Sequence, residues 1–243
     1  MGRPAAFLAA LAAVVAWYAV APHLGGMSLW WDIALLCIAV IPAVFGLVLL
    51  ALPLWNARRL LPIGIAFALL AFALSRAHFD VASNFAKLAA MVFLAWWFLS
   101  YFEEVSWVVL VAAIIPWVDA YSVWRGPTKH ITTKHENVFS ALSVGFVVPG
   151  GGAARLGLPD VLFFALFLAA AARFKLRVVW TWVGLAVGLG LTIVLATWWD
   201  VNGLPALPAL SLGFLLPNAD LLWDRLRRRE PRDAEPLPEG ARD

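Results

Sequence analysis

Long apolar stretches follow one another along most of the chain, and they constrain the fold more than any other feature. Eight of them approach the length of roughly 17 to 25 residues that a helix needs to cross the hydrocarbon core of a bilayer. They are residues 5–22, 29–54, 60–75, 84–101, 105–124, 157–173, 177–198 and 204–223. Spans in hydrocarbon must pair every backbone N–H and C=O within the protein, which favours helices. We therefore expect an all-α polytopic membrane protein.

The number of spans depends on the first two stretches. The first resembles a secretory signal ending in Ala19-Val20-Ala21, but Pro22 directly after this site disfavours cleavage, so we expect a retained helix. The second contains Pro42 and Pro53 and is either kinked or a broken helix that hides a further span. We predict eight, possibly nine, spans. They divide into amino-terminal helices over 1–104, about four in number, and helices over 105–223 with a loop at 125–155, followed by a charged disordered tail over 224–243.

The composition agrees with this class. Hydrophobic residues make up 63% of the 243 residues and charged residues 14%, whereas soluble domains have about 45 to 50% and about 25%. The net charge of +3 does not indicate nucleic-acid binding, because the basic residues gather at the ends of the apolar stretches. The single cysteine, Cys37, excludes an intrachain disulfide and thiolate metal clusters.

The distribution of Lys and Arg predicts the orientation. With eight spans and a cytoplasmic amino terminus, twelve Lys and Arg residues fall on the cytoplasmic side and six on the other. The positive-inside rule therefore favours a cytoplasmic carboxyl terminus and an outer loop at 125–155.

Two acidic residues within the apolar stretches are the strongest functional signal. A carboxylate at the centre of a membrane helix costs about 2.5 to 3.5 kcal/mol and marks a functional site by default. Asp119 and Asp160 each lie roughly 6 to 8 Å from the same membrane face, on neighbouring antiparallel spans, so their carboxyl groups can meet. Paired carboxyls in a low dielectric do not both ionise easily, and together they can activate a water molecule against a peptide carbonyl. The alternative is that Asp160 caps its helix and Asp119 pairs with Arg125.

The last apolar stretch opens with Pro205 and Pro208. Neither residue can donate a backbone hydrogen bond, so we expect extended or irregular backbone there. Irregular backbone at membrane depth lines a watery cavity or is buried in protein. A proline-rich helix start is the alternative.

These residues, taken in order, resemble a known family. Asp119, then Gly157-Leu158-Pro159-Asp160, then Pro205-Ala206-Leu207 is similar to the arrangement in the GxGD intramembrane aspartyl proteases, the presenilin and signal peptide peptidase family. Residues 120–130 also resemble the segment that follows the first aspartate in presenilin-like proteins. The resemblance covers 105–223, and it implies a presenilin-like bundle in a prokaryotic plasma membrane.

The resemblance assigns roles to these residues. It implies that Asp119 and Asp160 are catalytic, and that Gly157, Leu158, Pro159 and the Pro205-Ala206-Leu207 motif shape the site and seat the substrate. Two residues depart from the family pattern. Pro159 replaces the second glycine, and Val118 stands where the family often has Tyr, so both changes bear on substrate preference.

The loop at 125–155 has two further features. Residues 128–142 mix polar and apolar side chains in the manner of an interfacial amphipathic helix. Phe146-Val147-Val148-Pro149 is typical of a short strand, and Gly150-Gly151-Gly152 of a hinge. In the family this region can offer a strand edge to an unwound substrate, and an outer loop resembles the signal peptide peptidase arrangement, which favours type II substrates. An unstructured loop is the alternative.

The sequence lacks the residue spacing that a zinc protease needs. His130, His135 and Glu136 do not have the His-Glu-x-x-His spacing of a zinc protease, and we expect no metal or organic cofactor. We therefore predict an aspartic endopeptidase that cleaves transmembrane peptide or protein substrates within the lipid bilayer. A proton-coupled transporter or channel that uses the acids as a relay, and an inactive presenilin-like scaffold, are the alternatives. The sequence does not give the oligomeric state.

Overall fold

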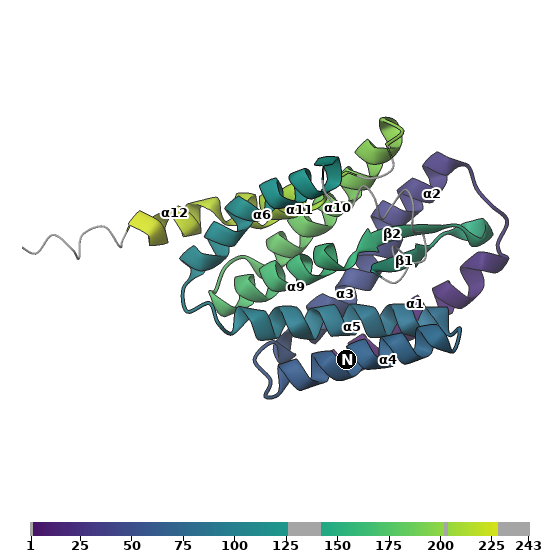
Figure 1. Cartoon of the computed structure of the whole chain (residues 1–243), viewed down its shortest axis with the longest axis horizontal. Coiled ribbons are helices and arrows are strands. Elements are labelled where there is room, and N and C mark those ends of the chain that lie inside the picture. The colour runs from purple at the N-terminus through teal and green to yellow at the C-terminus, as the bar shows by residue number, and fades with distance from the viewer. Residues whose placement is uncertain (1, 126–141, 202–203, 228–243) are drawn as a thin grey trace, which may run out of the picture.

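The computed structural model describes residues 2–125, 142–201 and 204–227, and helices dominate them (Figure 1). Five helical segments are long and apolar enough to cross a membrane: Arg3–His23, Leu29–Leu54, Asp80–Leu99, Val105–Val123 and Val178–Trp198. Leu60–Arg76 is apolar but shorter. The chain is thus an α-helical membrane protein, and the total of eight or nine spans stays a prediction.

The first two apolar stretches fold as α1 (Arg3–Val20) and as a segment that joins α2 (Leu29–Leu35) to α3 (Ile41–Ala51). A π-helical turn, Leu36–Val40, lies between α2 and α3 and ends two residues before Pro42. A proline ring clashes with the carbonyl four residues earlier, and the wider turn relieves that clash. The second stretch therefore forms one candidate span of 26 residues with a local irregularity.

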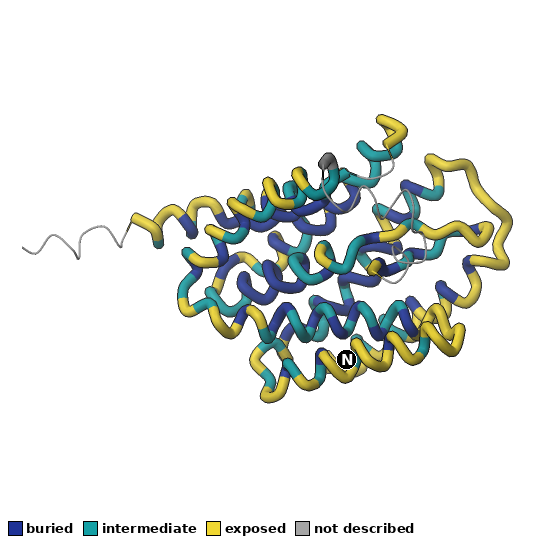
Figure 2. Tube along the Cα trace, viewed as in Figure 1, coloured by how far each residue is buried: buried dark blue, intermediate teal, exposed yellow. Residues whose placement is uncertain are grey.

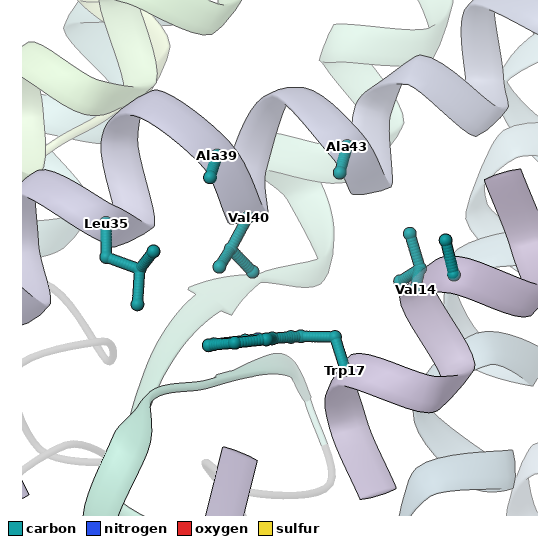
Figure 3. Close-up of a pocket in the computed structure, with 7 residues that line it drawn as sticks. Val14, Trp17, Leu35, Ala39, Val40 and Ala43 are labelled. Atoms are coloured by element: carbon teal, nitrogen blue, oxygen red, sulfur yellow. The ribbon is translucent and has the colours of Figure 1, made fainter. Parts of the chain in front are cut away.

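A cavity of about 210 Å³ lies between α1 and the α2–α3 segment. Figure 3 shows the Trp17 ring reaching from α1 across this space toward Val40 and Leu35. The rest of the lining is small or apolar, from Ala13, Val14, Ala39 and Ala43. Packing between α1 and this segment is therefore incomplete, and Trp17 bridges it.

Helix α4 (Leu60–Arg76) and helix α5 (Asp80–Leu99) form an antiparallel pair along one side of the molecule (Figure 1). The other face of α5 packs on α9 (Leu158–Arg173), which occupies the centre. Every side chain from residue 164 to residue 171 of α9 has no exposed surface, and Figure 2 shows this helix as mostly buried. A helix that is apolar on all sides is typical of such a central position.

The opposite side of the molecule holds α6 (Val105–Arg125), α10 (Val178–Trp198) and α11 (Leu207–Leu215) (Figure 1). Helices α10 and α11 touch through their backbones, because Gly184 faces Gly213 with no room for a side chain between them. A methyl group on Gly188 would likewise come within 2.8 Å of the Ala209 carbonyl oxygen. Small residues at the interface allow this close approach in membrane helices.

The carboxyl-terminal stretch differs from the prediction of one span over 204–223. Residues 204–206 are not helical, α11 ends at Leu215, and a 3-10 turn, Leu216–Asn218, leads into α12 (Ala219–Arg227). Residues 224–227, predicted as the start of a disordered tail, are therefore helical, since the buried Leu222 anchors α12. The remainder of that tail, 228–243, lies outside the described residues.

Part of the loop at 125–155 is a β-hairpin of β1 (Ser143–Val147) and β2 (Ala153–Gly157), antiparallel, with Ser143 opposite Gly157. The predicted strand at Phe146 is confirmed, although it ends at Val147 and the turn takes Pro149–Gly151. Gly150 and Gly151 have φ of 80° and 83°, which explains glycine at both positions. The amphipathic helix predicted over 128–142 falls almost wholly outside the described residues.

Side chains of the amino-terminal half pair with the outer edge of β1. The Tyr18 hydroxyl donates to the Gly145 carbonyl at 2.8 Å, and the Trp17 indole donates to the Val147 carbonyl at 3.1 Å. From α5, the Asn84 amide oxygen accepts the Gly145 N–H at 3.2 Å, and Lys87 Nζ donates to the Ser143 carbonyl at 3.2 Å. The hairpin is therefore held by α1 and α5 through its backbone.

Candidate active site

Asp119 lies in the last two turns of α6 and contacts the start of α11. Its Oδ2 accepts the backbone N–H of Leu207 at 3.0 Å, although 88 residues separate the two in sequence. Leu207 is the first residue of α11, and the first N–H groups of a helix have no partner within it. A carboxylate is favoured at a helix amino terminus. Asp119 therefore binds the donor that the irregular Pro205-Ala206 backbone leaves unpaired.

Asp160 is the third residue of α9, and its carboxyl group folds back over the start of that helix. A Cβ atom built on Gly157 would lie 3.2 Å from Oδ2 of Asp160, tighter than an ordinary contact. Gly157 has ordinary backbone angles, φ −61° and ψ 146°. The glycine is therefore explained by the space that the carboxyl group takes, and not by an unusual backbone conformation.

The two carboxyl groups interact with each other. Asp160 lies close enough to Asp119 for the charge of Asp119 to act on it, and both residues are partly buried. The one ion pair among the described residues joins Arg177 to Asp220, so neither acid has a described cationic partner. The alternative pairing of Asp119 with Arg125 lies outside the described side chains. Both acids do contact a helix start, so the capping alternative accounts for part of this geometry.

The remaining predicted site residues differ in how far they are buried. Ala206 and Leu207 are buried beside Asp119, and Leu158 donates its N–H to the Leu142 carbonyl at 3.0 Å, which extends the hairpin. Pro205 is partly buried, but Pro159 is exposed in the first turn of α9. A missing N–H is harmless in a first helical turn, so Pro159 replaces the expected glycine without cost to the helix. Val118 is 55% exposed and faces away from the interior.

Strand β2 leads directly into Asp160, and among the described residues its outer edge is unpaired at Arg155. The even-numbered residues of the hairpin pair with each other, as the bonds from Val148 N–H to the Gly152 carbonyl and from Leu158 N–H to the Leu142 carbonyl show. The backbone N–H and C=O of Arg155 therefore point away from β1, and no described residue pairs with them. Exposed strand edges of this kind can accept another extended chain.

Three residues that matter to this geometry escaped the sequence interpretation. Pro116 lies inside α6, three residues before Asp119, and leaves the Ala112 carbonyl without its helical donor. Gly184 and Gly213 bring α10 against α11 and so position Leu207. A proline inside an apolar stretch and glycines spaced by four residues, Gly184 and Gly188, were the available signals.

Comparison with known proteins found no family model that matches this chain and no curated protein that matches its sequence. Within the described residues, no three His, Cys, Asp or Glu side chains gather in a way that could hold a metal ion. The chemistry of the site must therefore be argued from its own residues, the two aspartates and the backbone around them.

Proposed function

We propose that this protein is an intramembrane aspartyl protease of the GxGD type. The observation that carries the proposal is the position of Asp119, whose carboxylate accepts the N–H of Leu207 and whose charge acts on the carboxyl group of Asp160. Two of the three separated motifs are thus joined by a hydrogen bond, and the third lies within range of the Asp119 charge. Pairs of carboxyls in a partly buried site are suited to share one proton, and this is the state that peptide hydrolysis by water requires.

The reaction that this pair supports consumes one water molecule. One carboxylate takes a proton from the water as its oxygen attacks the peptide carbonyl carbon, while the protonated carboxyl donates to the carbonyl oxygen. As the C–N bond breaks, a proton passes to the leaving nitrogen, and a carboxylic acid and an amine are released. Asp119 and Asp160 perform both roles, so the reaction has no step that calls for a cofactor.

The unpaired edge of β2 offers a place for the substrate. An extended substrate segment could pair with the N–H and C=O of Arg155, two residues before Gly157 and five before Asp160. The backbone of the substrate would then reach the carboxyl pair in a defined register. This mode requires local unwinding of a transmembrane substrate, since a helix pairs its own backbone groups.

The proposed orientation places the Asp160 end of α9 outside and the carboxyl terminus in the cytoplasm of a prokaryotic cell. It rests on the gathering of Arg58, Arg59, Arg173, Lys175 and Arg177 at the other end of the bundle. Under this orientation type II substrates are favoured. A cysteine can be introduced after Asp243 and exposed to a membrane-impermeant reagent in intact cells. If the reagent labels this cysteine, the orientation is reversed.

Cleavage of a reporter helix in reconstituted vesicles tests the proposed activity. Asp119→Ala and Asp160→Ala should each abolish cleavage, whereas Asp200→Asn, an exposed acid at the end of α10, should leave it unchanged. Continued cleavage by either alanine variant would remove the proposal. The transporter alternative would be favoured if the parent protein cleaved no reporter but conducted protons across the same vesicles, and if this proton flux stopped in both variants.

A further inference from the structure

A second cavity lies at the end of the bundle opposite to the two aspartates. It has a volume of about 270 Å³ and is bounded by the turn after α3, the carboxyl end of α5 and the carboxyl end of α9. Arg173 ends α9, whereas Asp160 lies in its first turn. Thirteen residues separate the two, which corresponds to about 20 Å along a helix axis. The cavity is therefore distinct from the proposed active site.

Arg173 contributes a partly buried cation to this cavity. One guanidinium nitrogen donates to the Leu99 carbonyl, and the group lies 6.0 Å from the centroid of the Trp55 ring. None of the described carboxylates pairs with it, although Glu103 and Glu104 lie in the turn after α5. A cation held in a partly buried position without a carboxylate has donors left for another anion.

The rest of the lining suits an anion with several oxygens. Asn56 and Ser100 are exposed at the cavity; the Asn56 amide supplies N–H donors, whereas the Ser100 hydroxyl donates to the Trp97 carbonyl at 2.6 Å. Trp96 forms a buried wall, and its indole nitrogen has no acceptor among the described residues. The Asn56 amide and the Arg173 guanidinium are therefore the donors that match the oxygens of a phosphate group.

The surroundings favour a phosphate that belongs to a lipid. Trp55 and Leu60 provide apolar walls beside the polar groups, and Arg58 and Arg59 lie in the same turn, exposed. Basic pockets between transmembrane helices at one membrane face are typical binding sites for anionic headgroups. A free phosphate would make no use of the apolar walls.

We propose that this cavity binds the phosphate headgroup of an anionic membrane phospholipid, with Arg173 as the principal contact. The acyl chains would leave along the apolar surface of the bundle. Bound lipid would join the α3–α4 turn to the carboxyl ends of α5 and α9. The proposal does not depend on the proposed protease activity, because it concerns binding at the opposite end of α9.

Native mass spectrometry of the full chain in detergent, with phosphatidylglycerol and phosphatidylcholine added in equal amounts, tests this site. The parent protein should retain one phosphatidylglycerol in clear preference to phosphatidylcholine. Arg173→Gln should lower that occupancy at least about fivefold, since a lost charged hydrogen bond weakens binding by roughly tenfold. Lys175→Gln is the matched control, because it removes the same charge at the same end from an exposed residue that does not line the cavity.

A second variant keeps the test independent of folding around Arg173. Ala57→Phe fills the cavity and leaves the guanidinium in place, and it should also displace the lipid. Equal lipid retention by Arg173→Gln, Ala57→Phe and the parent protein would overturn the proposal. Loss of phosphatidylglycerol on addition of millimolar inorganic phosphate would overturn the lipid assignment and identify a free-phosphate site, whereas unchanged retention supports the lipid.

Discussion

The helices that carry the two aspartates lie in opposite surroundings. Helix α9 is enclosed, and none of the side chains from residue 164 to residue 171 is exposed. Helix α6 exposes Trp107, Ile114 and Trp117, and it packs chiefly on α11. Close packing fixes α9 on all sides, but α6 is positioned by one neighbour and by the bond from Leu207 to Asp119. The distance between the carboxyl groups therefore depends mainly on how α6 is held.

Truncation of one side chain in each helix should show this difference directly. Phe164 stacks on Phe45 with 4.0 Å between ring centroids. Phe164→Ala should therefore lower the free energy of unfolding by about 3 kcal/mol. Ile114 of α6 is 52% exposed, and for this reason Ile114→Ala should have a much smaller effect, below about 0.5 kcal/mol. Denaturant titration in mixed micelles measures both. Equal losses would contradict the distinction between an enclosed and a peripheral helix.

The support that α11 gives to α6 can be removed without touching either aspartate. A Cβ atom on Gly213 would lie 2.5 Å from the Gly184 carbonyl oxygen, so Gly213→Ala must move α11 and with it Leu207. A misplacement of about 1 Å near a reacting centre costs roughly 100-fold, and we expect a fall in kcat of that order. Gly46→Ala, in α3 with no atom near its Cβ position, is the matched control. Full activity of Gly213→Ala would show that α6 is held in another way.

A substitution at Gly157 tests how the buried helix α9 holds the carboxyl group of Asp160. A methyl group there would press on Oδ2 of Asp160 and shift the carboxyl group by a few tenths of an ångström. Gly157→Ala should therefore reduce kcat by about tenfold, less than Gly213→Ala, because α9 itself does not move. Reporter cleavage against substrate concentration separates kcat from KM. A change in KM alone would place Gly157 in substrate binding only.

Pro159 should matter least among the residues next to Asp160. It is exposed in the first turn of α9, where proline is well tolerated. Pro159→Gly introduces the glycine of the GxGD pattern that this stretch resembles and adds flexibility to the unfolded chain. We expect kcat within about threefold of the parent value. A larger gain in reporter cleavage would show that the ring obstructs the substrate.

A pH-dependent contribution is expected far from the aspartates. The Arg177 guanidinium hydrogen-bonds to the exposed Asp220 at 2.6 and 2.8 Å and holds the pKa of that carboxyl below its usual range. A lowered pKa in the folded state stabilises the fold above the ordinary Asp pKa of about 4, and this contribution is lost as the pH falls through the lowered value. Asp220→Asn should lower the Tm by about 1 °C at pH 7. It should leave the Tm unchanged at a pH below the lowered pKa of Asp220, where this carboxyl is protonated. A pH-independent difference would exclude this ion pair as its cause.

The apolar stretches predicted where helices occur, but not how the helices are arranged. Residues 60–75, 105–124 and 177–198 were predicted as spans, and α4, α6 and α10 lie within two residues of those limits. In a membrane both the lipid and the protein interior are apolar, so α6 and α9 are both strongly apolar although one is peripheral and the other central. Contacts such as Gly184 with Gly213 therefore could not be found from hydropathy. The break at Leu215 was also missed, because Leu216 and Pro217 continue an apolar run.

The order of the two acids and the Pro205-Ala206-Leu207 motif did indicate which parts of the chain meet. The depth argument predicted Asp119 and Asp160 at the same membrane face, and in the structure the charge of Asp119 acts on Asp160. The motif was expected to lie beside the aspartates, and the N–H of Leu207 donates a hydrogen bond to Asp119. Acidic residues within membrane helices are easier to recognise from sequence than helix packing is, because few residue types can replace a carboxylate in hydrocarbon.

The outer edge of β1 makes the position of the hairpin independent of its own side chains. Trp17, Tyr18, Asn84 and Lys87 all bind backbone atoms of β1. Substitutions within the strand would leave those atoms in place, so the hairpin sequence could diverge while its location beside Asp160 persists. The constraint falls instead on the residues of α1 and α5 that bind these atoms. Removal of α1 should therefore free the 145–147 end of β1, the strand that pairs with β2 next to Asp160, even though Trp17 and Tyr18 lie more than one hundred residues before either aspartate.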